Sequence, residues 1–219
     1  MLPFIQGCGA YRASSEPRPV LCEPVATQFG AVILAAGASQ RMGTPKALLP
    51  WAGTTLLRHA VEQARAAGIE HIVVVLGPAT QDLTREPWLA EVTVRSNPDP
   101  ETGRSASIRI GSAALPDDVE AVIVQSVDQP CDSDVLVSLV AALDAGAADV
   151  TVPTHAGRRG HPVCLSRRLL PELRAVSEAG QGLRSIVKRH AVLEVPVSTP
   201  SVVWNLNDPA AYAAARRVE

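Results

Sequence analysis

The chain has 219 residues, of which 47% are hydrophobic and 19% charged, and its formal net charge is -2. This length suits one domain with a substantial core, and the charge leaves no broad basic surface of the kind that binds nucleic acid. No apolar stretch approaches the roughly 20 residues of a membrane span, so we expect neither nucleic acid nor a membrane as a partner.

The cysteines are widely spaced and include no Cys-x-x-Cys pair; they are Cys8, Cys22, Cys131 and Cys164. This spacing indicates neither a zinc site nor a disulfide framework. The first 28 residues lack the basic segment and the long apolar segment of a secretory signal. We therefore expect a cytoplasmic protein.

Residues 1–28 carry several prolines and follow no sustained helical or strand period. We predict that they form a poorly ordered N-terminal extension, and that residues 29–219 form a single domain.

A buried strand is predicted at residues 31–35, and a loop of small residues follows it as far as Lys46. Gly37 and Gly43 let the backbone N–H groups of this loop turn toward an anion, and Arg41 and Lys46 add two positive charges. The spacing fits neither the P-loop pattern G-x-x-x-x-G-K-[ST] nor the dinucleotide pattern G-x-G-x-x-G. The loop therefore predicts a polyphosphate site of another kind.

From residue 30 onward, apolar runs of strand length alternate with amphipathic segments of helix length, which predicts a mostly parallel sheet with helices on both faces. Further strands are predicted at residues 72–76, 92–94, 121–127 and 150–152. Thr54 can cap a helix that Gly68 ends, and helices are also predicted at residues 105–115 and 132–145. After Pro153 the pattern loosens. A strand at residues 163–165 and a helix from about Ser166 are predicted to form an insertion that covers the sheet, and residues 209–217 form the last helix.

Asp128 follows the predicted strand at residues 121–127 and precedes Gln129-Pro130. Ligands of α/β sheets bind beyond the carboxyl ends of the strands, where Asn97 and residues 205–208 are also expected. Mg²⁺ prefers oxygen ligands and needs one or two from the protein together with substrate phosphates. Asp128 could instead cap the helix near residue 132, so its position alone leaves metal binding and capping open.

The run Leu34-Ala-Ala-Gly-Ala-Ser-Gln-Arg-Met-Gly-Thr-Pro-Lys46 fits the pattern L-A-A-G-x-S-x-R-M-G-x-x-K. It resembles the signature of nucleotidyltransferases that join a nucleoside triphosphate to a phosphorylated acceptor and release pyrophosphate. Within them it looks most like the molybdenum-cofactor branch, the MocA-like and MobA-like NTP transferases. The resemblance extends from Gly30 to Arg217 and implies a Rossmann-like, three-layer α/β/α fold of the GT-A-like type with a mostly parallel central sheet.

The segment from Asn97 to Gly111 resembles the family pattern N-x5-G-x3-S-[IL]-x2-G, which lies over the base and ribose. Glycine and serine at the start of a helix could also be ordinary caps, and Arg104 could face phosphate or solvent. The nucleotide-binding residues that the resemblance implies are Leu34, Ala35, Ala36, Gly37, Arg41, Lys46, Asn97, Gly103, Ser105 and Ser107. The catalytic residues that it implies are Arg41, Lys46 and Asp128.

Strand-Asp-Gln-Pro resembles the metal-binding motif of the same family, which implies that Asp128 binds Mg²⁺ or Mn²⁺. Asn205-Leu-Asn207 stands where the cytidylyltransferase branch has D-[IL]-D, so the second metal-binding role passes to Asn207, with Asn205 as an auxiliary. The guanylyltransferase branch has a similar N-x-N, and amide oxygens bind Mg²⁺ more weakly than carboxylates. Asn207 or Asp208 could instead cap the last helix.

Gly157-Arg-Arg-Gly-His-Pro-Val163 resembles the acceptor loop of molybdopterin cytidylyltransferases. The resemblance implies that the acceptor is bound by Arg159, Gly160, His161 and Pro162. Gln181-Gly-Leu-Arg-Ser185 resembles a further segment of that branch.

The favoured function is transfer of a nucleoside monophosphate from CTP to molybdopterin, with release of pyrophosphate. CTP is favoured because Ala36 stands where guanylyltransferases tend to have Gly, and the added methyl group should crowd a purine. A GTP-dependent guanylyltransferase and a sugar- or polyol-phosphate nucleotidyltransferase stay open. So does a non-catalytic cofactor-binding chaperone for a molybdoenzyme, which the amides of Asn205 and Asn207 favour. The expected partners are a nucleoside triphosphate, a phosphorylated acceptor and a molybdoenzyme.

Overall fold

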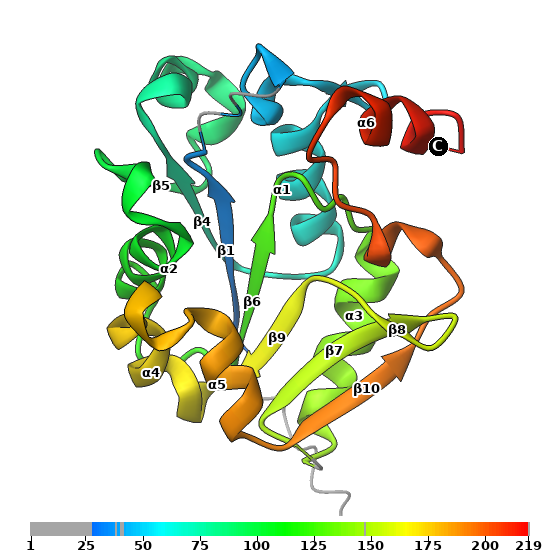
Figure 1. The fold of residues 1–219 in the computed structure, drawn as a ribbon. Coiled ribbons are helices and arrows are strands. Elements are labelled where there is room, and N and C mark those ends of the chain that lie inside the picture. The colour runs from blue at the N-terminus through cyan, green and yellow to red at the C-terminus, as the bar shows by residue number, and fades with distance from the viewer. Residues whose placement is uncertain (1–27, 38, 40–41, 147, 219) are drawn as a thin grey trace, which may run out of the picture.

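The structure is a computed structural model that describes residues 28–37, 39, 42–146 and 148–218. Within these residues, eight strands form one sheet in the order β10-β7-β9-β6-β1-β4-β5, and β8 pairs with β7 (Figure 1). The strands of this sheet are β1 (Phe29–Ala35), β4 (His71–Leu76), β5 (Thr93–Ser96), β6 (Ala121–Ser126), β7 (Val150–His155), β8 (Arg158–Arg159), β9 (Val163–Ser166) and β10 (Val192–Pro196). Residues 1–27 of the predicted extension lie outside the described residues.

Most neighbouring strands of the sheet are parallel, as the sequence predicts. β1 pairs in parallel with β4 and β6, β4 with β5, and β7 with β10. β9 runs antiparallel between β6 and β7, and the short strand β8 also pairs antiparallel with β7. The prediction that residues 163–165 belong to an insertion covering the sheet is therefore wrong. Their short apolar run is buried inside the sheet, and periodicity alone does not indicate which strands such a run will join.

The helices cover both faces of the sheet (Figure 1). α1 (Leu56–Ala66) and α3 (Ser133–Asp144) pack on one face, where Ala31, Ile33 and Ala35 of β1 point. α2 (Arg104–Ala113), α4 (Leu170–Ala175) and α5 (Leu183–Arg189) pack on the other face, against Val32 and Leu34. Successive side chains of a strand point to opposite faces, so one apolar run supplies both cores, and the three-layer α/β/α fold is confirmed.

The connections contain short elements that the periodicity does not predict. β2 (Pro50–Trp51) and β3 (Thr54–Thr55) form a separate hairpin before α1, and α6 (Pro209–Ala215) follows the last connection. The 3₁₀ turns are Lys46–Leu48, Pro78–Arg85, Pro87–Leu89, Pro100–Thr102, Arg167–Leu169, Glu178–Gly180 and Pro200–Val203.

The cap of α1 differs from the prediction by one residue. Thr55 accepts a hydrogen bond from the Arg58 N–H at 3.3 Å, whereas Thr54 pairs with Trp51 in the hairpin. The helix predicted from about Ser166 is a 3₁₀ turn that continues into α4. No helix in the described part of the chain is long and apolar enough to cross a membrane.

Candidate active site

The loop after β1 brings Lys46 to the carboxyl end of the sheet. The Ser39 hydroxyl accepts a hydrogen bond from the Lys46 backbone N–H at 2.9 Å, and Lys46 then begins a 3₁₀ turn. Ser39 has a φ of 53°, a left-handed conformation that few non-glycine residues adopt. Arg41, which the sequence assigns to the same site, lies outside the described residues.

Lys46 joins two residues that are distant from it in the sequence. Its ammonium nitrogen lies 2.8 Å from Asp128 Oδ2 and 2.8 Å from Asn207 Oδ1. The strand end, the loop after β1 and the C-terminal segment therefore meet at one point, as the sequence predicts for Lys46 and Asp128.

Asp128 is held at the end of β6 by the backbone on both sides. The Val127 N–H donates to the Leu34 carbonyl at 3.2 Å, and the Asp128 carbonyl accepts the Leu206 N–H at 2.9 Å. Burial raises the pKa of the Asp128 carboxyl, but the hydrogen bond and charge of Lys46, together with smaller effects of Ser126 and Arg104, hold that pKa below its ordinary value. Asp128 is therefore a carboxylate at neutral pH.

Asn207 reaches Lys46 because the C-terminal segment is anchored by a small apolar cluster. Leu206, which is 1% exposed, packs with Trp51, Leu56 and Ala215. The Tyr212 hydroxyl donates to the Pro50 carbonyl, which ties α6 to the β2–β3 hairpin. Asp208 caps α6 by accepting the Ala211 N–H at 2.8 Å, so the alternative helix-capping role goes to Asp208 and leaves the Asn207 amide available to Lys46.

The oxygens around Lys46 fit a divalent cation. Asp128 Oδ1 is buried and has no hydrogen-bond partner, while Asp128 Oδ2 and Asn207 Oδ1 already share one cationic group. Carboxylate and amide oxygens are ligands that Mg²⁺ and Mn²⁺ use. The described residues contain no group of three or more His, Cys, Asp or Glu that could hold a metal ion. This donor set therefore suits an ion that completes its shell with phosphate oxygens and water.

A cavity of about 210 Å³ opens beside Lys46 and Asp128. Eight of the residues predicted for the nucleotide and catalytic site line it: Leu34, Ala35, Ala36, Gly37, Lys46, Gly103, Ser107 and Asp128. Ser39, Arg104 and Ser126 also line it. Ser39 occupies the serine position of the signature motif, so the motif contained a signal for it.

Asn97 and Ser105 lie behind the cavity wall. Asn97 donates to the Ser107 hydroxyl at 2.9 Å and accepts the Asp99 N–H at 3.1 Å, so it holds the loop before α2 in place. The backbone N–H of Ser105 donates to Glu178 Oε1 at 2.6 Å. This hydrogen bond holds the pKa of Glu178 below its ordinary value.

Glu178 packs tightly against Gly103, and the sequence does not predict this contact. A Cβ at Gly103 would lie 2.5 Å from Glu178 Cγ, and Gly103 has a φ of 101°, so both space and conformation require glycine. The two residues are 75 positions apart, and neither carries a local pattern that indicates the other.

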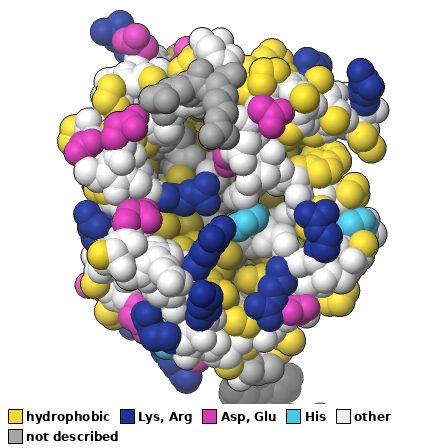
Figure 2. Space-filling view, in the orientation of Figure 1, with side chains coloured by type: hydrophobic (Ala, Val, Ile, Leu, Met, Phe, Trp, Pro, Cys, Tyr) yellow, Lys and Arg dark blue, Asp and Glu magenta, His cyan; other side chains and the backbone are white. Residues whose placement is uncertain are grey.

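The predicted acceptor loop is only partly directed toward this cavity. His161 lies close enough to Asp128 and Arg104 for their charges to act on it. Burial, followed by the positive charge of Arg104, lowers the pKa of His161, while the Asp128 carboxylate opposes both effects. On the face of the molecule that Figure 2 shows, a histidine lies among basic side chains around a central hollow.

The other residues of that loop have contacts elsewhere. Arg159 is exposed and donates to Glu194 at 2.6 Å, toward the outer strand β10. Gly160 packs against the Val202 backbone, where a Cβ would lie 2.3 Å from the carbonyl oxygen, and Pro162 is buried. The structure therefore brings His161, but not Arg159, toward Asp128.

The family of MobA-like NTP transferase domains matches residues 31–195, about three quarters of the chain. The chain belongs to this family. The matched residues include the loop with Lys46, the strand that precedes Asp128 and the predicted acceptor loop, and the family makes the chain a domain of the nucleotidyltransferase type.

Several known proteins resemble this MobA-like domain. Nicotine blue oxidoreductase of Paenarthrobacter nicotinovorans is 30% identical over 165 residues, which are 72% of this chain and 80% of that protein. The bifunctional protein GlmU of Mycolicibacterium gilvum is 37% identical over 134 residues, which are 56% of this chain and 26% of GlmU. The chain thus spans only about a quarter of the length of that relative.

Among solved structures, Rv0371c of Mycobacterium tuberculosis H37Rv superposes with a TM-score of 0.76 at 29% identity, over 88% of this chain and 99% of that one. A structure of Rv0371c in complex with manganese superposes with a TM-score of 0.72 at 27% identity, over 86% of this chain and 97% of that one.

A larger cavity, of about 380 Å³, lies at the opposite end of the strands of this MobA-like domain. It lies beside Phe29, Ala121 and Asp149, at or next to the amino ends of the parallel strands β1, β6 and β7. Ligands of parallel α/β sheets bind beyond the carboxyl ends instead, so the smaller cavity beside Lys46 is the candidate active site.

Proposed function

We propose that this MobA-like domain transfers a nucleoside monophosphate from a nucleoside triphosphate to a phosphorylated acceptor. The favoured pair is CTP and molybdopterin. The observation that supports this best is the meeting of Lys46, Asp128 and Asn207 beside a cavity whose wall is the glycine-containing loop after β1.

The proposed reaction is an in-line displacement at the α-phosphorus of the triphosphate. A terminal phosphate oxygen of the acceptor forms a bond to this phosphorus, and the bond from the α-phosphorus to the bridging oxygen breaks. Pyrophosphate leaves with the electron pair of that bond. The acceptor phosphate is already an anion near neutral pH, so catalysis rests on positioning and charge neutralisation rather than on a general base.

Each residue near the cavity has a proposed role. The backbone around Gly37 faces the triphosphate, and Lys46 neutralises its oxygens, together with Arg41 from the same loop. Gly103 and Ser107 form the wall for the nucleoside, and the neutral His161 faces the acceptor.

Asp128 and Asn207 are the proposed ligands of a divalent cation. When bound, Mg²⁺ or Mn²⁺ supplies positive charge to the phosphate oxygens and to the leaving pyrophosphate. The manganese complex of Rv0371c supports the choice of a divalent cation as the bound ion. Asn207 offers an amide oxygen rather than a carboxylate, so we expect weaker metal binding than two carboxylates would give.

CTP is proposed over GTP because the buried Ala36 lines the cavity, and its methyl group leaves less room for a purine. The pair Asn205 and Asn207 keeps GTP as the next triphosphate to test. A sugar or polyol phosphate is the next acceptor, and a non-catalytic chaperone would bind the same molecules without releasing pyrophosphate.

A redox activity is the second candidate function. It is favoured by one observation, the name of the oxidoreductase that matches 72% of this chain at 30% identity. Incubation with nicotine blue and a two-electron donor such as a reduced nicotinamide tests it, and the redox candidate is discarded if nicotine blue is not reduced.

The deciding experiment measures pyrophosphate release with Mg²⁺ and each of the four common triphosphates, with and without molybdopterin. We expect release only when both substrates are present, and most with CTP. Asp128→Asn keeps the shape of the side chain but removes its charge, and should lower the rate on the order of 10²- to 10³-fold. Asp82→Asn, at a residue whose side chain is 96% exposed, is the matched control and should be fully active. Equal rates for the two variants would contradict the proposal.

A further inference from the structure

A second cavity, of about 510 Å³, adjoins the candidate active site. Arg104 lines both cavities, so the two share a wall at the start of α2. Three cationic side chains and one carboxylate line the second cavity: Arg104, Arg184, Lys188 and Glu178. The resulting net charge of +2 suits a dianionic group such as a phosphate monoester.

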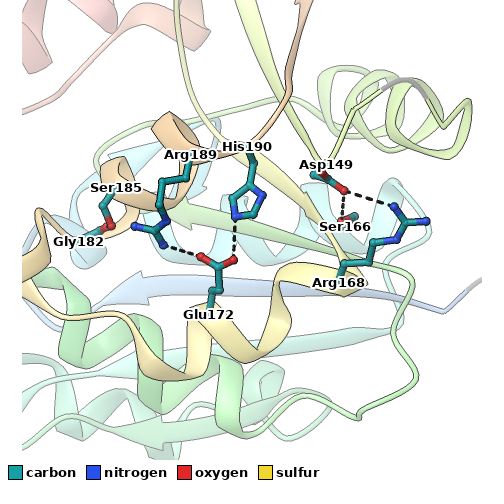
Figure 3. Close-up of polar contacts among 8 residues, drawn as sticks. All are labelled: Asp149, Ser166, Arg168, Glu172, Gly182, Ser185, Arg189 and His190. Carbon is teal, nitrogen blue, oxygen red and sulfur yellow. Dashed lines mark hydrogen bonds and ion pairs between the residues drawn. The ribbon is translucent and has the colours of Figure 1, made fainter.

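Helix α5 directs two of these cations toward the cavity. The Ser185 hydroxyl donates to the Gly182 carbonyl at 2.9 Å in the first turn of the helix (Figure 3). Arg184 and Lys188 are four residues apart and so lie on one face. Arg189 lies on another face and donates to Glu172 of α4 at 2.5 Å (Figure 3). Arg189 is thus a cation of the same helix that does not face the cavity.

The cations of the cavity outnumber its single carboxylate, Glu178, and none of them forms an ion pair with a described carboxylate. Lys188 donates to the neutral amide of Gln181 at 3.1 Å. Over residues 28–37, 39, 42–146 and 148–218, no ion pair involves Arg104, Arg184 or Lys188. Other arginines, such as Arg159 and Arg174, do form ion pairs with carboxylates. The difference indicates that the three cations of the cavity are available to a ligand.

A buried hydroxyl in the same wall also lacks a hydrogen-bond partner. Ser105 is 1% exposed, and its Oγ, which lies near the Glu178 carboxylate, makes no hydrogen bond of good geometry to the described residues. A buried polar group without a partner is destabilising, and an oxygen of a ligand in the cavity would relieve this cost. Gly182 keeps the wall tight at this point, because a Cβ there would lie 3.0 Å from Ser105 Oγ.

The cavity is electrostatically connected to the proposed reaction centre. Burial is the main cause of the lowered pKa of His161, and the positive charges of Arg104 and Arg184 lower it further. The carboxylate of Asp128 acts on the same imidazole in the opposite sense. Arg104 and Arg184 therefore lie within electrostatic range of His161.

We propose that this second cavity binds the phosphate monoester group of the acceptor, with Arg104, Arg184 and Lys188 as its cationic ligands. These residues take the role that sequence resemblance assigns to Arg159. Arg104 borders both cavities, so it lies between the acceptor phosphate and the nucleotide. The inference rests on the proposed function for the identity of the acceptor.

The test compares three variants by calorimetry at low salt: Arg184→Met, Arg184→Met/Lys188→Met and, as the control from the same helix, Arg189→Met. The probes are two phosphate monoesters, molybdopterin and glucose 1-phosphate, and CTP with Mg²⁺. We expect monoester binding to weaken about tenfold for each cation removed from the cavity. CTP binding should change less than about twofold in all three variants, because none of the replaced side chains lines the proposed nucleotide cavity. Arg189→Met should bind the monoesters as the wild type does, because Arg189 does not line the second cavity.

The inference is overturned if the double variant binds the monoesters as tightly as Arg189→Met does. It is also overturned if CTP binding weakens equally, or if neither monoester binds the wild type. Pyrophosphate release is measured separately. A wild type that binds a monoester through these residues, yet releases no pyrophosphate from any triphosphate, would disprove the proposed function and leave this binding site intact.

Discussion

Replacing Lys46 with methionine tests the central contact of the proposed site. The substitution keeps an unbranched side chain that is one atom shorter, and removes the charged nitrogen that lies 2.8 Å from both Asp128 and Asn207. The side chains of Lys46 and Asp128 are only 14% and 9% exposed, so water cannot replace the lost partner fully. The variant therefore leaves a mostly buried carboxylate without its ion-pair partner, and among the described residues only the more distant charge of Arg104 remains to act on it.

The expected loss of stability is about 3–5 kcal/mol at pH 7, the usual cost of removing one partner from a buried ion pair. A Coulomb energy of about 6 kcal/mol at this distance, for an effective dielectric constant near 20, sets the upper end. The desolvation of the ammonium in the wild type offsets part of it. In the variant, burial is the dominant remaining influence on Asp128, so we expect the pKa of its carboxyl to lie above its ordinary value instead of below it.

This reversal of the pKa shift gives the prediction a pH signature. In the wild type, the lowered pKa of Asp128 contributes stability that is present above the unfolded value of 3.8 and is lost as the pH falls through the folded pKa. In the variant, the raised pKa makes Asp128 destabilising at neutral pH, and protonation relieves this as the pH falls. The difference in stability between the two proteins should therefore shrink from pH 7 toward pH 4.

Urea unfolding of Lys46→Met, Asp128→Asn and the double variant at several pH values measures these quantities. Lys188→Met is the control, because Lys188 is exposed and is the other lysine of the chain. A coupling energy below about 0.5 kcal/mol between positions 46 and 128, or a stability difference that does not vary with pH, would refute the reasoning.

Three further predictions concern the metal site, the histidine and the C-terminal anchor. Asn207→Asp supplies a second carboxylate and should tighten Mn²⁺ binding about tenfold or more by calorimetry, whereas Asn207→Ala should weaken it; equal affinities would exclude residue 207 as a ligand. Because the pKa of His161 is lowered in the folded protein, the unfolded chain binds a proton at His161 near pH 6.5, whereas the folded protein binds it only at a lower pH. Wild-type stability should therefore fall below pH 6.5 by at most about 1.4 kcal/mol per pH unit, and His161→Gln should remove this component in urea unfolding at pH 5 to 7. Leu206→Ala should cost about 2–5 kcal/mol and weaken Mn²⁺ binding by releasing Asn207, whereas Leu139→Ala, at an equally buried site in α3, should destabilise without changing Mn²⁺ affinity.

Much of the fold follows from local patterns in the chain. The apolar runs of β1, β4 and β6 predict buried parallel strands, and the spacing of apolar residues in α1 predicts a helix with one buried face. The loop with Lys46 and the strand that precedes Asp128 carry their own motifs. These predictions succeed because burial at a period of two or 3.6 residues is written into each segment separately.

The placement of β9 shows the limit of such patterns. Its run of Val163 to Leu165 is as apolar as a parallel strand, and its direction and neighbours come from the packing of β6 and β7 around it. The β2–β3 hairpin and β10 are also absent from the prediction, because two-residue strands and half-exposed edge strands give no clear period.

By itself, the sequence determined which faces of its segments are buried and which chemical groups stand at the strand ends, because both are properties of short stretches of chain. Only the tertiary structure decided that Asn207 meets Lys46 across 161 positions and that Glu178 accepts a hydrogen bond from the start of α2. It also decided that Arg184 lines the cavity next to the site, whereas Arg159 pairs with Glu194. Hydrogen bonds and charges between distant segments depend on how the layers pack together, and no local pattern specifies that packing.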